Sequence, residues 1–227
     1  MSPSELERVL EPEAMDTTEE AEGYDRMDHR AANASFSERL FELGATGHLL
    51  DIGTGPAHLP IMICERDQEV RVTAIDLAHE MLRVARRNIV ASGLEDRIEL
   101  LHGDAKQLQL PTANFDGVYS NTILHHIPDP RPFLREAARL LRPAGVLLIR
   151  DLFRPRDEAR LKELVELYTV GCDDYQRALF AASLRAAFTP EELREVCNEC
   201  DLAAAEVVVD SDRHVSILLR ASPRHGR

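Results

Sequence analysis

Short apolar runs alternate with amphipathic stretches along the middle of the chain. The runs, most of them rich in valine, isoleucine and leucine, predict strands at His48–Ile52, Arg71–Ile75, Ile98–His102, Gly117–Ser120 and Val146–Asp151. Apolar residues at helical spacing between them predict helices at about 58–66, 78–91, 122–127 and 130–142. Because near-continuous apolar strands are separated by helices, the pattern indicates a parallel sheet covered on both faces.

Both ends of the chain depart from this alternation. Apolar residues from Tyr24 onward recur at helical spacing, and Gly44 is placed to end that helix. After residue 153, consecutive helices are predicted at 155–170, 173–187 and 189–200. Two further strands, Glu206–Val209 and Val215–Leu219, are joined by a polar loop and indicate a hairpin at the sheet edge.

The first part of the chain is strongly acidic. Residues 1–28 hold ten acidic and two basic residues, which accounts for −8 of the net charge of −13. An acidic surface without a basic stripe repels phosphate backbones, which argues against nucleic acid as a partner. No apolar run approaches the roughly 18 residues of a membrane span, and the first thirty residues show no secretory signal. The four cysteines, at 64, 172, 197 and 200, are expected to be reduced thiols, as in a cytoplasmic protein.

One predicted strand runs directly into a turn that contains two glycines. Asp51 stands near the end of His48–Ile52, and Gly53 and Gly55 follow it before a predicted helix. Glycines let the backbone approach a ligand closely, and a helix N-terminus offers free N–H groups. A dinucleotide fingerprint would place a third glycine where the chain has His58, and an acid before the first glycine suits pyrophosphate poorly. The turn is therefore either an ordinary strand–helix connection or a site for a phosphate-free, zwitterionic nucleoside.

Two more acids end the neighbouring strands. Asp76 follows Asp51 by 25 positions, where a carboxylate can bind the two hydroxyls of a ribose. Asp104 follows the third strand and is suited to accept a hydrogen bond from an exocyclic amine. Each acid alone is also a common helix cap or turn residue. Together they indicate a ligand site, because ligands bind at the carboxyl ends of parallel strands.

These segments resemble the class I S-adenosylmethionine-dependent methyltransferases, in particular the small-molecule branch that includes ubiquinone and menaquinone methyltransferases. The resemblance is close over residues 24–152 and extends to the remainder by topology. It rests on Leu-Asp-Ile-Gly-Thr-Gly at 50–55, Ala-Ile-Asp-Leu-Ala-His-Glu-Met-Leu at 74–82, Gly-Asp-Ala at 103–105, Phe-Asp-Gly-Val-Tyr-Ser-Asn at 115–121, Leu-His-His-Ile at 124–127 and Leu-Leu-Arg-Pro-Ala-Gly-Val-Leu at 140–147.

The resemblance implies an α/β fold with a doubly wound, seven-stranded Rossmann-like sheet. Five strands would be parallel, with a terminal antiparallel hairpin, a helical insertion and an N-terminal helical lid. The expected divisions are an acidic, loosely ordered arm at 1–23 and one methyltransferase domain at 24–227. That domain would consist of a lid helix (24–44), a cofactor-binding core (45–153), the helical insertion (154–201) and the hairpin (202–221).

The same resemblance implies which residues bind S-adenosyl-L-methionine. Asp51, Gly53 and Gly55 would hold its methionine part, and Asp76 would hold its ribose. The remaining predicted cofactor-binding residues would surround the adenine, close the site from the N-terminal helix or end the fourth strand; they are Leu77, Met81, Asp104, Ala105, Tyr24, Asn33, Ser120 and Asn121.

Two adjacent histidines follow the fourth strand, close to where a sulfonium methyl group would point. His126 and His125 are candidates for a catalytic base, because imidazole accepts a proton near neutral pH. Either ring could instead pack under the sheet or cap the next helix. The strand lacks the Asn/Asp-Pro-Pro-aromatic run of enzymes that methylate amino groups of DNA and glutamine, and no cysteine stands in the Pro-Cys pair of cytosine C5 enzymes.

Charged residues after the fifth and sixth strands form a candidate rim for the substrate. They are Arg150, Asp151, Arg154, Arg213 and His214. A rim of arginines and acids suits a polar or anionic small molecule, although the same charges are also typical of solvated loops. The Cys-x-x-Cys pair at 197 and 200 lacks a second ligand pair, so no metal site is expected.

The sequence therefore predicts an enzyme that transfers a methyl group from S-adenosylmethionine to a small-molecule acceptor. A non-catalytic S-adenosylmethionine-binding regulator is the alternative, and turnover to S-adenosylhomocysteine would distinguish the two. A nicotinamide-dependent oxidoreductase is disfavoured by Asp51 and by the missing third glycine.

Overall fold

Seven strands form one sheet in the order β3-β2-β1-β4-β5-β7-β6. The structure, a computed structural model, describes residues 6–11, 16–200 and 202–220. The strands are β1 (His48–Ile52), β2 (Arg71–Asp76), β3 (Ile98–His102), β4 (Phe115–Asn121), β5 (Leu141–Leu152), β6 (Glu206–Val209) and β7 (His214–Leu219). β1 to β5 are parallel, and β7 runs antiparallel between β5 and β6. The predicted fold is thus confirmed, with the reversal of strand order, where such sheets bind ligands, between β1 and β4.

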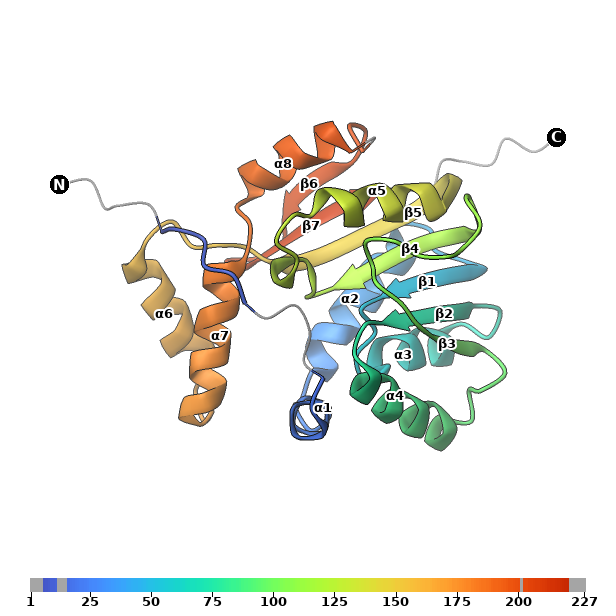
Figure 1. The fold of residues 1–227 in the computed structure, drawn as a ribbon, viewed down its shortest axis with the longest axis horizontal. Coiled ribbons are helices and arrows are strands. Elements are labelled where there is room, and N and C mark those ends of the chain that lie inside the picture. Colours follow the sequence, from blue (N-terminus) through green and yellow to red (C-terminus); the bar gives the residue numbers. More distant parts are fainter. Residues whose placement is uncertain (1–5, 12–15, 201, 221–227) are drawn as a thin grey trace.

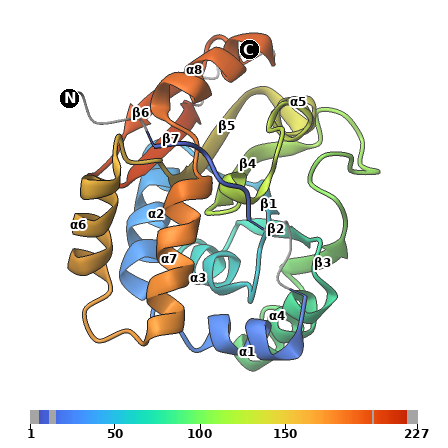
Figure 2. The same cartoon turned by 60° about the vertical axis from the view of Figure 1, so that its left-hand side comes forward.

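Helices cover both faces of the sheet (Figure 1). They are α1 (Thr18–Asp25), α2 (Arg30–Glu42), α3 (His58–Arg66), α4 (His79–Ser92), α5 (Arg131–Leu140), α6 (Glu158–Tyr168), α7 (Asp174–Ala186), α8 (Pro190–Glu199) and the 3-10 turn η1 (Leu124–His126). α2, α3 and α4 lie on one face, and α5 and α8 lie on the other. α6 and α7 stand as a hairpin beyond the carboxyl ends of the parallel strands (Figures 1 and 2). Across the described ranges, no helix combines the length and apolar character that a membrane span requires.

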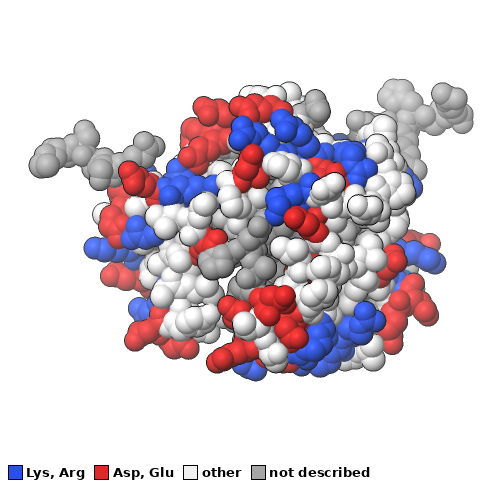
Figure 3. Space-filling view, in the orientation of Figure 1, with Lys and Arg blue, Asp and Glu red and all other residues white. Residues whose placement is uncertain are grey.

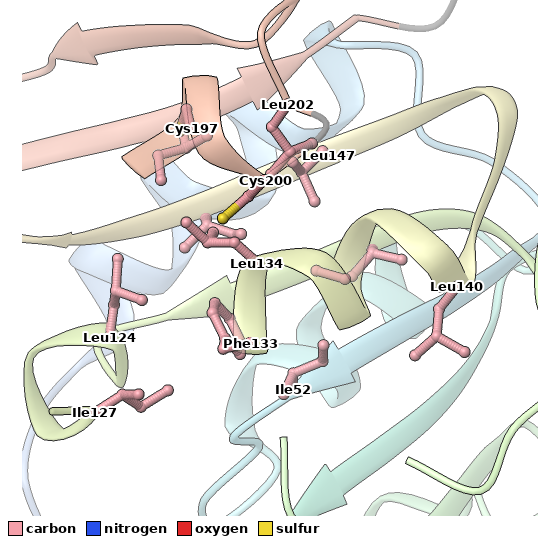
Figure 4. Packing of buried hydrophobic residues seen from close by; sticks show 14 of the residues in the cluster. Ile52, Leu124, Ile127, Phe133, Leu134, Leu140, Leu147, Cys197, Cys200 and Leu202 are labelled. Atoms are coloured by element: carbon pink, nitrogen blue, oxygen red, sulfur yellow. The ribbon is translucent and has the colours of Figure 1, made fainter. Parts of the chain in front are cut away.

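Successive side chains of β1 point to opposite faces of the sheet, and the interior is divided into two hydrophobic cores. Leu50 and Ile52 face α5 and α8, whereas Leu49 faces α2 and α3. Figure 4 shows Phe133 of α5 and Cys197 of α8 in the first of these cores. Burial raises the pKa of Cys197 to about 11, so this cysteine is a packed thiol.

The structure has two helices where the sequence predicted one beginning near Tyr24. α1 begins earlier because Thr17 and Glu20 form a capping box, in which each side chain accepts from the other residue's backbone N–H, at 3.2 and 3.1 Å. The second helix starts where the backbone N–H of Arg30 donates to the Asp28 carboxylate at 3.1 Å. The break between them lets the chain turn back toward the sheet.

Part of the acidic N-terminal region is docked by charge pairing. Glu22 accepts from Arg83 and Arg87 at 2.9 Å, and Asp25 pairs with Arg87 at 2.6 Å. Figure 3 shows acidic and basic side chains next to one another at the lower edge, over α1 and α4. Three ion pairs thus join α1 to α4, and exposed pairs of this kind stabilise little singly and more as a network. Residues 1–5 and 12–15 of the predicted arm, and the boundary residues 201 and 221, lie outside the described residues.

Candidate functional site

A cavity of about 760 Å³ lies at the carboxyl ends of the parallel strands, bounded by α1, α2 and the α6–α7 hairpin. Its volume is in the range of small-molecule and cofactor sites. The residues predicted for a site that line it are Tyr24, Asn33, Asp51, Gly53, Gly55, Asp76, Leu77, Met81, Asp104, Ala105, Asn121, His126, Arg150, Arg213 and His214. The structure thus brings most of the predicted residues into one cavity.

The turn after β1 requires its two glycines. Gly53 has a φ of +79°, and a Cβ there would lie 2.4 Å from the side chain of Ile123. Gly55 has a φ of +54° and lies under the ring of Tyr24. The N–H of Gly53 donates to the carbonyl oxygen of Ile75 at 2.8 Å, which fastens the turn to the end of β2. The turn therefore presents backbone without side chains at the floor of the cavity.

Asp51 is a buried carboxylate at this floor. It is 2% exposed, and its Oδ2 atom has no hydrogen-bond partner among the described residues. Burial raises the pKa of Asp51 to about 8; the nearby Thr54 hydroxyl opposes this, without reaching hydrogen-bond geometry to Oδ2, and the neighbouring Asp76 carboxylate adds to it. Leaving a buried acceptor without a partner is costly. The position therefore favours a cationic ligand group that donates to Oδ2.

Asp76 joins the glycine turn to the cavity. Its Oδ2 atom accepts from the N–H of Gly55 at 2.7 Å, and its Oδ1 atom accepts from the N–H of Ala78 at 2.9 Å. Burial raises the pKa of Asp76, while these backbone donors lower it. Because each carboxylate oxygen has more than one lone pair, Asp76 can hold the turn and still accept from a ligand hydroxyl.

α1 and α2 close the cavity on the N-terminal side. The ring of Tyr24 stacks on His29 with their centroids 4.7 Å apart. Asp25 pairs with Nε2 of His58 at 2.7 Å, which links α1 to the start of α3. Burial raises the pKa of Tyr24, and Asn33 is 8% exposed. Both residues predicted to cover the ligand therefore lie in an enclosed wall.

Arginines and the α6–α7 hairpin form the other end of the cavity. Arg150 is 9% exposed and donates to Oδ1 of Asn121 at 3.2 Å and to the carbonyl oxygen of Ala32 at 2.9 Å. Within the described part of the chain, Arg150 forms no ion pair with a carboxylate. The guanidinium of Arg213 lies 3.4 Å from the centroid of the Tyr168 ring. Burial lowers the pKa of Arg150 and the nearby Asp210 carboxylate raises it, while Arg213 pairs with Asp212 at 3.3 Å. This end of the cavity therefore holds charges of both signs and suits a polar or anionic ligand.

The two adjacent histidines occupy different environments. His126 lines the cavity, whereas His125 is 2% exposed and does not. Nδ1 of His125 lies 2.6 Å from Oδ1 of Asp151, and the backbone N–H of His125 donates to Oδ2 at 2.9 Å. Burial favours the neutral ring, but the charge of Asp151 and this hydrogen bond outweigh it and raise the pKa of His125. Of the two rings, a ligand in the cavity can reach that of His126.

Comparison with known proteins agrees with this geometry. Residues 50–149, which run from β1 into β5, match the family described as "Methyltransferase domain". The chain contains a class I methyltransferase domain. The resemblance drawn from the sequence motifs is therefore confirmed.

Relatives of this methyltransferase domain include the 27-O-demethylrifamycin SV methyltransferase of Amycolatopsis mediterranei, which is 32% identical over 166 residues, or 69% of this chain and 59% of that protein. The demethylmenaquinone methyltransferase of Listeria monocytogenes serotype 4a is 36% identical over 118 residues, or 52% of this chain and 49% of that protein. The chain thus spans about half to three-fifths of the length of these curated relatives.

The fold is shared with solved structures at lower identity. A S-adenosylmethionine-dependent methyltransferase from Aquifex aeolicus superimposes with a TM-score of 0.67 at 18% identity, and the match covers 92% of this chain and 100% of that one. At this identity the likeness is one of fold.

Four residues predicted for the site lie outside the cavity lining of the methyltransferase domain. The hydroxyl of Ser120 donates to a backbone carbonyl of β1 at 2.7 Å. Arg154 is buried and pairs with Glu192 at 2.7 Å. His125 and Asp151 pair with each other. Each of these side chains is committed to a contact that holds elements together around the cavity, so we assign none of them a ligand.

Sequence reasoning missed residues that reach the site from outside the central sheet. Tyr168, Gln176 and Phe180 line the methyltransferase cavity from α6 and α7, and Oε2 of Glu11 lies 3.3 Å from Nδ1 of His126. No local pattern marks these residues, because helical spacing identifies an apolar face and not which side chains reach a distant loop. The start of α1, in contrast, had a local signal in Thr17-x-x-Glu20.

Proposed function

We propose that this protein transfers a methyl group from S-adenosyl-L-methionine to a small-molecule acceptor and releases S-adenosylhomocysteine. The observation that carries the proposal is the buried Oδ2 atom of Asp51, which has no partner among the described residues. The ammonium of the methionine part would donate to this oxygen and supply the positive charge that the buried carboxylate needs.

The remaining lining residues fit the rest of such a cofactor. The carboxylate of Asp76 is available to two ribose hydroxyls. Leu77 and Met81 offer apolar surface to an adenine, and Met81 is 6% exposed. Asp104 and the backbone of Ala105 stand where they can accept from and donate to the edge of that ring.

The main contribution of the protein to this reaction is to position the cofactor and the acceptor. S-adenosylmethionine supplies an electrophilic methyl group on a sulfonium, so no activating group is needed on the protein for that half of the reaction. Tyr24 and His29 cover the cavity and exclude water. His126 lines the acceptor side and can accept a proton when the acceptor must lose one.

The charges on the acceptor side support an anionic small molecule. Arg150 is buried without a carboxylate partner in the described part of the chain, and Arg213 lines the same region. A carboxylate or phosphate on the acceptor would pair with Arg150, whereas Arg213 is already paired with Asp212 at 3.3 Å. A protein that only sensed the cofactor would have no use for this second half of the cavity.

The deciding experiment is a screen of metabolite extracts with methyl-labelled S-adenosylmethionine and the purified protein. We expect a labelled, anionic product together with S-adenosylhomocysteine. Cofactor binding without turnover in any extract would favour a regulator, and the absence of cofactor binding would reject the proposal.

We expect cofactor binding at pH 7 to release close to one proton. The pKa of Asp51 is raised to about 8, so most of the free protein carries a proton there, which must leave before the carboxylate receives an ammonium. For the same reason, affinity rises from pH 6 toward pH 8. Calorimetry with S-adenosylhomocysteine, in buffers of different ionisation enthalpy, counts the proton. Asp51→Asn should abolish the release and weaken binding, whereas the exposed Asp96→Asn should do neither; proton uptake would contradict the assignment.

We expect Asp76→Asn to weaken cofactor binding by roughly ten- to a hundredfold, because a hydrogen bond to a charged group contributes about 1.5–3 kcal/mol. The amide keeps an oxygen for only one of the two backbone donors that Asp76 now serves and turns its –NH2 group toward the other, so the turn should lose some stability and the fold of the variant has to be checked. Calorimetry measures the affinity, and thermal unfolding of the ligand-free protein checks the fold. An affinity within about twofold of the wild type would remove Asp76 from the ribose site.

A further inference from the structure

Residues 6–11 form an extended segment that lies against the residues flanking α6 and α7. The backbone N–H of Leu6 donates to the carbonyl oxygen of Arg156, and that of Val9 donates to the carbonyl oxygen of Arg185, both at 3.2 Å. The side chain of Leu6 is buried among residues of α6 and α7. Figure 2 shows the segment, in dark blue, crossing the end of α7. The segment is therefore fixed along its length.

Arg8 fastens this segment to the loop after η1. Its Nε atom donates to the carbonyl oxygen of Ala186 at 2.6 Å, and its two terminal nitrogens donate to the carbonyl oxygens of Ile127 and Pro128 at 3.0 Å. The guanidinium also lies 3.6 Å from the centroid of the Phe188 ring. Arg8 thus binds carbonyl oxygens at the end of α7 and after η1, and it holds the residues that follow it next to η1.

Glu11 enters the space beside the two histidines. Its side chain is 8% exposed, and its Oε2 atom lies 3.3 Å from Nδ1 of His126 and 3.8 Å from Nε2 of His125. Its Oε1 atom has no hydrogen-bond partner among the described residues, and Ser183 donates to Oε2 at 3.4 Å. Burial raises the pKa of Glu11, and the charge of His125 opposes this. The carboxylate is thus enclosed and directed at the imidazole rings.

Four titratable groups form a row at the cavity wall, in the order Asp151, His125, Glu11 and His126. The first two are 2.6 Å apart, and the two imidazole rings lie tilted against each other with their centroids 4.1 Å apart. Arg8 also faces this row and donates to the carbonyl oxygen of His125 at 3.3 Å, and the ring of His214 faces Asp151 from β7. Acidic and basic groups alternate along the row. A histidine that gains a proton is therefore stabilised by the carboxylate next to it.

The same groups include three of metal-ligating type, since ligand atoms of Glu11, His125 and His126 lie within 4.8 Å of one another. Nδ1 of His125 already pairs with Asp151 at 2.6 Å, and Oε2 of Glu11 lies at ion-pair distances of 3.3 and 3.8 Å from the two rings. The geometry favours proton binding over metal binding.

We propose that Glu11 is a positioning residue for His126. Its carboxylate would hold the N–H at Nδ1 and so leave Nε2 as the proton acceptor of the ring. This inference rests on the proposed methyl transfer. In that step the acceptor atom gives its proton to Nε2 and gains the methyl group, and the electron pair of the broken carbon–sulfur bond stays on sulfur. Glu11 would stabilise the imidazolium that results.

The test compares Glu11→Gln with Glu7→Gln, which removes the same charge from an exposed position of the same segment. Nuclear magnetic resonance of histidine-labelled protein follows the ring of His126, identified by its loss in His126→Asn. We expect this ring to titrate at a lower pH in Glu11→Gln than in the wild type, because the imidazolium loses an anion that lies 3.3 Å from its Nδ1 atom. Turnover should fall tenfold or more, with the acidic limb of the pH–rate profile displaced in the same direction and cofactor affinity unchanged. Glu7→Gln should change none of these, and Glu11→Asp, which keeps the charge, should recover part of the loss.

An unchanged titration of His126 in Glu11→Gln, with a wild-type protein that methylates its acceptor, would overturn the inference and leave the proposed function intact. A wild-type protein that forms no methylated product would overturn the proposed function, even where the titration shift is found. Turnover that is lost with a chelator and restored by zinc or manganese alone would also overturn the inference, since the cluster would then hold a metal ion. If Glu11→Gln does not fold, the titration of His126 is compared between the wild type and Glu11→Asp. The shorter side chain places the carboxylate farther from the ring, which should lower the titration midpoint of His126. Equal midpoints in the two proteins would contradict a role of Glu11 in positioning this ring.

Discussion

Replacing His126 by alanine is expected to lower turnover by roughly 10²–10⁴-fold for an acceptor that loses a proton during methyl transfer. His126 lines the acceptor side of the cavity and has Glu11 beside its Nδ1 atom. The residues proposed to bind the cofactor lie at the ends of β1, β2 and β3, so cofactor affinity should stay close to that of the wild type. Single-turnover kinetics and calorimetry separate these two effects.

The control for this variant is His79→Ala, which removes an imidazole from an exposed position at the start of α4. It should leave turnover unchanged. If His126→Ala methylates at the wild-type rate across the pH range, general-base catalysis by this residue is ruled out, and transfer depends on positioning alone.

Replacing Asp151 by alanine should reduce the free energy of unfolding by about 3–5 kcal/mol, the usual cost of removing one partner of a buried ion pair. The carboxylate accepts from the ring of His125 at 2.6 Å, from its backbone N–H at 2.9 Å and from the N–H of Leu152 at 2.6 Å. All three donors would be left buried without their partner. Urea unfolding at pH 6 measures the change, and Asp129→Ala, at an exposed pair with Arg131, should cost at most about 1 kcal/mol.

The contribution of this pair should depend on pH in a defined direction. The pKa of His125 is raised in the folded state, because the Asp151 carboxylate outweighs the effect of burial, so its contribution is present below about pH 6.5 and is lost as the pH rises through the folded value. The pKa of Asp151 is lowered: burial raises it, but the charge of His125 outweighs burial, so its contribution is present above about pH 4 and is lost as the pH falls further. The stability difference between the wild type and Asp151→Ala should therefore be largest between about pH 4 and pH 6.5. A difference that stays level from about pH 5 to pH 9 would show that His125 is neutral in the folded protein.

The cofactor side of the site follows from local sequence. Each strand end that carries Asp51, Asp76 or Asp104 is marked by an apolar run that stops at an acid, and parallel strands bring such ends to one edge. The glycine turn is likewise visible, because positive φ values at Gly53 and Gly55 leave few alternatives to glycine.

The acceptor side could not be assigned in this way. His125 and His126 are neighbours in one 3-10 turn, and only the packing of η1 against β5 decides that the first ring meets Asp151 while the second faces the cavity. Arg150 and Asp151 are also neighbours, and the period of two along β5 sends one to the cavity and the other beneath it.

What the sequence by itself determined is the α/β fold, the family and the row of acids at the strand ends, because each depends on residues close together in the chain. The tertiary structure alone decided that Glu11 lies beside His126 and that Arg8 binds the carbonyls after η1, across 115 and more positions of sequence. Those contacts depend on how an extended segment packs against α7. An extended segment has no periodic pattern from which its packing partner could be predicted. The physical reason is the same in each case: local spacing fixes which face of an element is buried, and only the packing of elements fixes which side chains meet.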